Sequence, residues 1–174
     1  MNILYLDSSQ SYLVIGLQIA DRFAEKVILH ANKIGSVLSL SIKEFIEESH
    51  LSWHDLDKIV VGAGPGSYTG TRVGVAFAET LAFGLDIPLI KIPSLVFYLS
   101  EQETCLKIKS QLGTYGYLEH KDGAFFYQQI PASDANTSAR TLDPKNLIAS
   151  PHWPHIERAG SQESLEALLY FSLS

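Results

Sequence analysis

Three glycines and several small hydroxyl side chains follow a short apolar run near residue 60. Residues 59–61 (Ile-Val-Val) are β-branched, which predicts a strand that is buried on both faces. Gly62, Gly64 and Gly66 come next, and an apolar helical pattern begins near residue 70. Free N–H groups at the start of a helix can bind an anion, so the spacing indicates either a phosphate-binding loop or a structural turn.

Neither standard phosphate fingerprint fits this loop. A Walker A loop ends in Gly-Lys-Ser/Thr, whereas Gly70 is followed by Thr71 and Arg72. The dinucleotide pattern requires a third glycine, and counting from Gly64 that position holds Thr69. Glycine spacing alone therefore leaves both interpretations open.

A second candidate for phosphate contact lies at the end of the first predicted strand. Asp7, Ser8 and Ser9 follow an apolar run and resemble a phosphate-binding hairpin of the actin-like ATPases, although no glycine stands in this turn. In the alternative interpretation, Asp7 caps the turn or forms hydrogen bonds within it.

Other residue types that could do chemistry form no recognisable motif. The sequence contains no HExxH, GxSxG or paired-carboxylate motif, which argues against a hydrolase. His50 and His54 are four residues apart, but the residues between them predict a helix end, so we expect no metal site. Cys105 is the sole cysteine, which excludes an internal disulfide, and we expect it to be a small core residue.

Composition indicates a compact soluble protein. The 174 residues are 46% hydrophobic and 18% charged, with a formal net charge of −6. An acidic surface disfavours direct RNA binding, but it can still dock on a basic partner. No apolar stretch reaches the roughly 18 residues that span a bilayer, and no secretory leader pattern opens the chain. We therefore expect a cytoplasmic protein without a membrane partner.

The hydrophobic patterns predict an α/β protein with two lobes, residues 1–102 and a shortened second lobe over residues 103–174. In the first lobe we expect strands at 2–7, 12–19, 26–30, 58–62 and 88–92, with helices at 36–49, 70–84 and 93–102. In the second lobe we expect strands at 105–110, 114–119 and 123–130, and a terminal helix at 161–171.

The helix predicted over residues 70–84 is apolar around most of its circumference. Gly70, Gly74 and Ala78 recur every four residues and offer a stripe for close helix packing. Val73, Phe77 and Leu81 form a second apolar ridge. Such a helix must be covered on both sides, by a partner subunit or by neighbouring helices of the same chain.

The loop sequence resembles a known family motif. The eleven residues from Gly64 to Gly74 are similar to the GPGSFTGLRIG motif of the bacterial TsaB (YeaZ) family, with only small exchanges at Tyr68, Thr71 and Val73. The segments around residues 1–9, 51–57 and 87–95 also resemble that family, so the resemblance covers roughly the first hundred residues. The motif positions are Gly64, Pro65, Gly66, Ser67, Tyr68, Thr69, Gly70 and Arg72.

The resemblance implies an actin-like (ASKHA, ribonuclease H-like) fold and a non-catalytic subunit that makes N6-threonylcarbamoyladenosine at position 37 of tRNA. It implies a TsaD-like catalytic partner, a TsaE-like ATPase reached through the complex, a homodimer when alone, and only indirect contact with tRNA. No cofactor is expected, and nucleotide would bind weakly and only in the complex. The interface implied is formed by two helices, through Val37, Ser41, Phe45, Gly70, Val73, Gly74, Phe77, Ala78 and Leu81.

Two positions depart from the family pattern. Ile34 stands where related chains usually have histidine, and Lys109-Ser110-Gln111 replaces an Asp-Ala-Arg sequence. Two alternatives therefore stay open. One is a nucleotide-binding actin-like enzyme, a small-molecule kinase or ATPase, with Asp7 and the Gly64–Gly70 loop as phosphate clamps. The other is a stand-alone homodimer without a role in tRNA modification.

Overall fold

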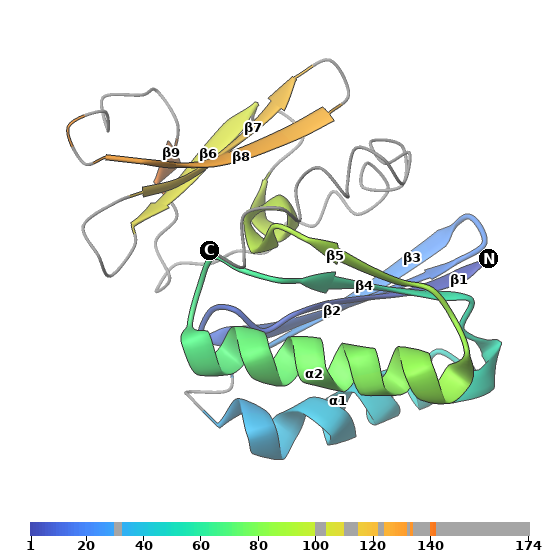
Figure 1. Ribbon diagram of the computed structural model, residues 1–174. Coiled ribbons are helices and arrows are strands. Elements are labelled where there is room, and N and C mark those ends of the chain that lie inside the picture. Colours follow the sequence, from blue (N-terminus) through green and yellow to red (C-terminus); the bar gives the residue numbers. More distant parts are fainter. Residues whose placement is uncertain are drawn as a thin grey trace.

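The computed structural model describes residues 1–29, 33–99, 104–109, 115–121, 124–131, 133 and 140–141. Its first half forms a five-stranded sheet in the order β3-β2-β1-β4-β5 (Figure 1). The strands are β1 (Asn2–Asp7), β2 (Tyr12–Ile19), β3 (Arg22–Leu29), β4 (Lys58–Gly62) and β5 (Leu89–Ile92). β1, β2 and β3 pair antiparallel, whereas β4 pairs parallel with both β1 and β5.

Two helices, α1 (Ile34–Glu48) and α2 (Tyr68–Leu85), cover one face of this sheet (Figure 1). α1 buries Ile34, Leu38 and Ile42, whose spacing of four residues places them on one side of the helix. These side chains join Leu4, Leu6 and other sheet residues in a single core cluster. The layer of helices is thus held by apolar burial on its inner side.

The opposite face of the sheet carries a short 3₁₀ helix, η2 (Ser94–Tyr98), and a second sheet (Figure 1). The second sheet has the order β8-β7-β6-β9 and consists of β6 (Cys105–Lys109), β7 (Tyr115–Lys121), β8 (Ala124–Ile130) and β9 (Arg140–Thr141). Leu106 and Leu118 of the second sheet share a core cluster with Tyr5 and Val60 of the first, and with all of η2 except Ser94. The two sheets are therefore joined by one continuous apolar core.

The structure differs from the predicted elements in a few places. β3 begins at Arg22 instead of residue 26, because its pairing with β2 continues to the Arg22–Ile19 pair. Both helices begin two residues earlier than predicted, and β9 was not predicted. The helix predicted over 93–102 is only the 3₁₀ helix η2, since Leu99 adopts an extended conformation (φ −79°, ψ 126°). The predicted terminal helix at 161–171 lies outside the described residues.

One further short 3₁₀ helix, η1 (Trp53–Asp55), precedes β4 and is capped by Ser52. Asp55 Oδ2 accepts hydrogen bonds from the Ser52 backbone N (2.7 Å) and hydroxyl (2.7 Å), which lower the pKa of Asp55. Among the helices of the described part, none has the length and apolar character needed to cross a bilayer.

Candidate functional site

The glycine-rich loop connects β4 to α2 through a tightly fixed turn. Gly64 has a φ of 104°, a conformation that favours glycine, and the Gly64–Pro65 peptide bond is cis. Ser67 is the N-cap of α2, and its hydroxyl accepts a hydrogen bond from Gly70 N at 3.2 Å. The strand, the turn and the helix predicted from the sequence are therefore confirmed.

The loop lies directly against the turn between β1 and β2. Ser67 N donates to Ser9 O at 2.6 Å, and the Ser8 hydroxyl donates to Gly70 O at 2.8 Å. A Cβ at Gly66 would lie 2.3 Å from Ser9 O, which leaves room for glycine alone. Because Ser67 N and Gly70 N have partners within the chain, neither of these amides is available to an anion.

The second phosphate candidate faces the interior of the protein. Asp7, Ser8 and Ser9 are each at most 1% exposed. Their side chains form hydrogen bonds with neighbouring groups of the chain and do not point to solvent. In this structure Asp7, Ser8 and Ser9 therefore have the internal hydrogen-bonding role that the sequence analysis gave as the alternative to a phosphate clamp.

Asp7 is the centre of a buried polar cluster. Its Oδ2 accepts hydrogen bonds from the Tyr98 hydroxyl at 2.6 Å, from the Ser9 hydroxyl at 2.9 Å and from Ser9 N at 3.3 Å. Its Oδ1 has no well-aligned donor among the described residues, although the Ser94 hydroxyl is near enough to stabilise its charge. Gly62 lies directly against Oδ1, so no side chain fits between β4 and this carboxyl.

Burial decides the ionisation of this cluster. Loss of solvation raises the pKa of Asp7 above its ordinary value of 3.8, and the hydrogen bonds from Ser94, Tyr98 and Ser9 only partly oppose this rise. Burial and the adjacent carboxyl also raise the pKa of Tyr98 well above 10. The folded protein therefore holds a proton at Asp7 more tightly than the unfolded chain does.

We expect this proton to make stability depend on pH. Below pH 3.8 Asp7 is protonated in both states; above it the unfolded chain loses the proton first, so stability falls with rising pH and levels off above the raised folded pKa. The Asp7→Asn variant has no carboxyl group at this position, so this contribution to the pH dependence of stability is absent from it. Its free energy of unfolding, minus that of the wild type, should therefore increase above pH 3.8 by at most about 1.4 kcal/mol per pH unit. Urea titrations between pH 3 and 8 measure the difference, and a decrease with rising pH would show that the fold favours the carboxylate.

The small-residue stripe of α2 is turned inward, not toward a partner. Gly70 and Gly74 lie against Ser8, and Ala78 is fully buried in the core beneath the sheet. Phe45 of α1 is 6% exposed and belongs to the same core. These four residues were predicted to form an interface, whereas in the isolated chain they lie in the core, because the stripe allows the helix to approach its own sheet.

The remaining interface candidates lie at the boundary of the core. Val37 and Ser41 of α1 and Val73, Phe77 and Leu81 of α2 are half-buried. The apolar ones among them pack against the core from its edge. The large apolar side chains of the helix layer that are more than half exposed are others, namely Leu40, Tyr68 and Phe83, none of which the sequence analysis placed at an interface.

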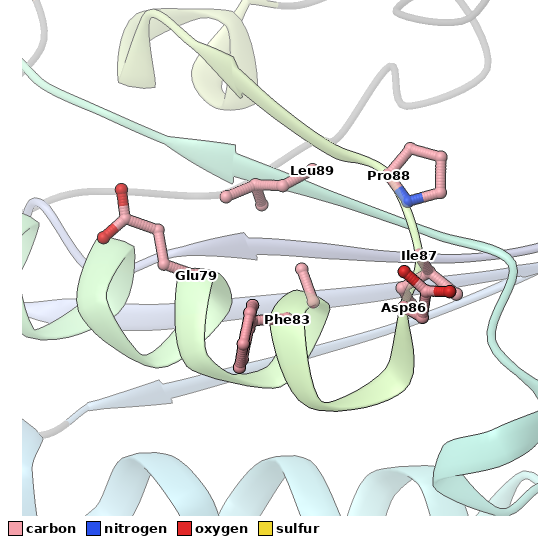
Figure 2. Close-up of a pocket in the computed structure, with 7 residues that line it drawn as sticks. Glu79, Phe83, Asp86, Ile87, Pro88 and Leu89 are labelled. Carbon is pink, nitrogen blue, oxygen red and sulfur yellow. The ribbon is translucent and has the colours of Figure 1, made fainter.

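The exposed face of α2 has distinct ends. At the first turn, the Arg72 guanidinium lies 4.1 Å from the ring centroid of Tyr68. At the last turn, Phe83 is 91% exposed beside a shallow hollow lined by Glu79, Ala82, Phe83, Asp86, Ile87, Pro88 and Leu89 (Figure 2). Glu79 also pairs with Lys91 of β5 at 2.6 Å. This face therefore combines aromatic side chains with few charges.

The structure also places the cysteine and one of the two positions that depart from the family pattern. Cys105 is half-buried at the start of β6, and no group of three or more metal-ligating side chains occurs in the residues that the structure describes. Ile34 is buried as the first residue of α1. Ser110 and Gln111 lie outside the described residues.

Sequence reasoning missed the residues that complete the Asp7 cluster. Ser94 and Tyr98 belong to η2, and Tyr98 is 91 residues from Asp7 in the sequence. The available signal was a buried aspartate without a basic neighbour, which requires uncharged donors from elsewhere in the fold.

The mixed sheet, with two helices on one face and a second sheet on the other, is an actin-like α/β fold. Two solved structures share it: "YeaZ from Pseudomonas aeruginosa" (TM-score 0.66, 20% identity, 75% of this chain and 67% of that chain), and a protein described by its "similarity to peptidase YEAZ from Pseudomonas aeruginosa" (TM-score 0.69, 19% identity, 79% and 69%). At these identities the likeness establishes the fold.

Sequence comparisons identify the family that this chain resembles. A model for "TsaD: tRNA N6-adenosine threonylcarbamoyltransferase" matches residues 29–105. The "tRNA threonylcarbamoyladenosine biosynthesis protein TsaB" of Bacillus subtilis is 41% identical over 96 residues, which are 55% of this chain and 42% of that protein. The Haemophilus influenzae protein of the same name is 46% identical over 54 residues, 31% of this chain and 23% of that protein. The resemblance to the TsaB (YeaZ) family is confirmed, and the chain matches less than half the length of these relatives.

Proposed function

We propose that this chain acts in the biosynthesis of N6-threonylcarbamoyladenosine in tRNA as a non-catalytic subunit that binds a TsaD-like transferase. The observation that carries the proposal is the glycine loop. Its sequence resembles that of TsaB-like proteins, and its backbone and hydroxyl groups form hydrogen bonds that hold the start of α2 against the β1–β2 turn. A loop used in this way positions a helix and performs no chemistry of its own.

The exposed face of the helix layer supports the role of a binding subunit. Leu40, Tyr68 and Phe83 are large apolar side chains that remain more than half exposed on α1 and α2. Aromatic and aliphatic anchors of this kind contribute much of the binding energy at protein interfaces. In this proposal, Val37, Ser41, Val73, Phe77 and Leu81 form the half-buried base of the same surface.

The proposal also covers the homodimer, the ATPase and the tRNA. The isolated chain would form a homodimer through this face, and the TsaD-like protein would displace the second copy. A TsaE-like ATPase would be reached only through the complex, and the transferase would hold the tRNA, because the net charge of −6 opposes binding of RNA. The chain would need no cofactor. The kinase or ATPase alternative has less support, since one of its two proposed clamps, formed by Asp7, Ser8 and Ser9, is buried.

Reconstituted tRNA modification tests the proposal. The chain is combined with the TsaD-like and TsaE-like proteins of its own organism, threonylcarbamoyl-adenylate and tRNA, and the modified nucleoside is quantified by mass spectrometry. We expect modification to require the chain, and the Ser67→Ala variant to retain activity within about tenfold, far from the roughly thousandfold loss on removal of a catalytic group. Modification that proceeds equally well without the chain would contradict the proposal.

A further inference from the structure

The loop of Gly64, Pro65, Gly66 and Ser67, here called the latch, is held by the first lobe through several bonds. Ser94 is the main contact, because its backbone N donates to Gly64 O at 2.7 Å and its hydroxyl accepts from Gly64 N at 2.9 Å. Gln10 Nε2 lies 3.4 Å from Pro65 O. Together with the bond from Ser67 N to Ser9 O, these contacts fix both ends of the latch and its middle.

The second sheet lies against the other side of the latch. Gly116 of β7 packs between the Pro65 ring and the Tyr127 side chain of β8. A Cβ at position 116 would lie 2.9 Å from Pro65 Cγ and 2.9 Å from the Tyr127 hydroxyl oxygen. Such distances are shorter than real Cβ contacts, so a side chain here would displace the latch or the strands.

Asp7 connects the groups that hold the latch. Its carboxyl is fully buried and interacts with Ser9, Ser94 and Tyr98. Ser9 bonds the end of the latch and Ser94 bonds its beginning, while Tyr98 belongs to the apolar core shared with the second sheet. One carboxyl therefore ties β1, η2 and the latch together.

We propose that the latch is a conformational joint, a segment through which a structural change in one lobe passes to the other. Ser94 and Asp7 fix the latch from the side of the first sheet, and Gly116 packs against it from the side of the second sheet. Weakening the contacts on one side of the latch then also weakens those on the other side, since both sets of contacts are made with the same four residues. The start of α2 is part of this joint, because Ser67 is both the last latch residue and the N-cap. This inference concerns the isolated chain and does not depend on the proposed function.

Hydrogen exchange measured by mass spectrometry tests the joint from the first lobe. The Ser94→Ala variant removes the hydroxyl that accepts from Gly64 N and leaves the backbone bond in place. We expect exchange to increase at least about tenfold in the latch, in the first turn of α2 and in β7, and to remain unchanged in α1. The matched control is Ser49→Ala, which removes a hydroxyl that donates to Phe45 O at 2.8 Å at the end of α1. It should leave exchange in the latch and in β7 unchanged.

The reverse experiment begins in the second sheet. The Gly116→Ala variant places a methyl group against Pro65, and we expect faster exchange at Gly70 N and Thr71 N, in the first turn of α2. This variant also serves if Ser94→Ala does not fold. Faster exchange confined to the mutated lobe in either variant, or an equal increase throughout the protein, would overturn the proposal.

Discussion

Replacing Leu40 or Phe83 by aspartate is expected to weaken binding to the TsaD-like partner at least about tenfold, which corresponds to about 1.4 kcal/mol. Both side chains are exposed on the helix layer, Leu40 at 57% and Phe83 at 91%. The substitution therefore costs the isolated chain little stability, while in a complex it would place a charge in an apolar contact. Titration calorimetry with the purified partner measures the loss, and circular dichroism verifies the fold.

The chain offers matched controls for both variants. Leu29 on β3 is 62% exposed and Phe126 on β8 is 56% exposed, so Leu29→Asp and Phe126→Asp make the same chemical change away from the helices. We expect both controls to bind the partner like the wild type. If all four variants bind equally well, the outer face of α1 and α2 is not the docking surface. Phe77→Asp is a poorer test, because Phe77 packs on the core.

The largest loss of stability is expected at Gly70 and Gly74. A Cβ at Gly70 would lie 2.2 Å from the backbone oxygen of Ser8, and one at Gly74 would lie 2.2 Å from the Ser8 hydroxyl oxygen. Gly70→Ala should therefore lower the free energy of unfolding by about 3 kcal/mol, and Gly74→Leu by more, because α2 must move away from its sheet. If such a variant fails to dimerise or to bind a partner, the cause would be loss of the fold and not loss of an interface residue.

Gly84 provides the control on the same helix. A Cβ at this position meets nothing within 4 Å, so Gly84→Ala should raise the free energy of unfolding by about 0.5–1 kcal/mol through helix propensity alone. Urea unfolding of the three variants side by side gives the comparison. Equal changes at Gly70 and Gly84 would contradict the close approach of α2 to Ser8.

Local patterns predicted most of the five-stranded sheet and the two helices that cover it. The short, continuous apolar runs within residues 2–7 and 58–62 predict buried strands, and the four-residue spacing of Leu38 and Ile42 predicts a helix. The apolar stripe of α2 was also detected, but its partner was not. A stripe of small residues indicates that another element packs closely against the helix, whereas the identity of that element depends on the tertiary fold.

The polar cluster could not be predicted for a related reason. Asp7 is hydrogen-bonded by Tyr98, and η2 brings these residues together only after the chain has crossed the sheet and formed two helices. The exposed anchors Leu40 and Phe83 were missed because helical periodicity identifies the inner side of a helix and gives no reason for an apolar residue on the outer side.

The edge strand β5 limits how copies of this protein can aggregate. It has four residues, and Pro88 and Pro93 at its two ends have no N–H group to donate. Lys91 adds a charge at the middle of the strand. Short edges bordered by proline and lysine resist pairing with a strand of another molecule. Crowded or partly unfolded copies should therefore not extend this sheet into fibrils at β5, and β3, the longer strand at the opposite edge, is the edge that is open to pairing.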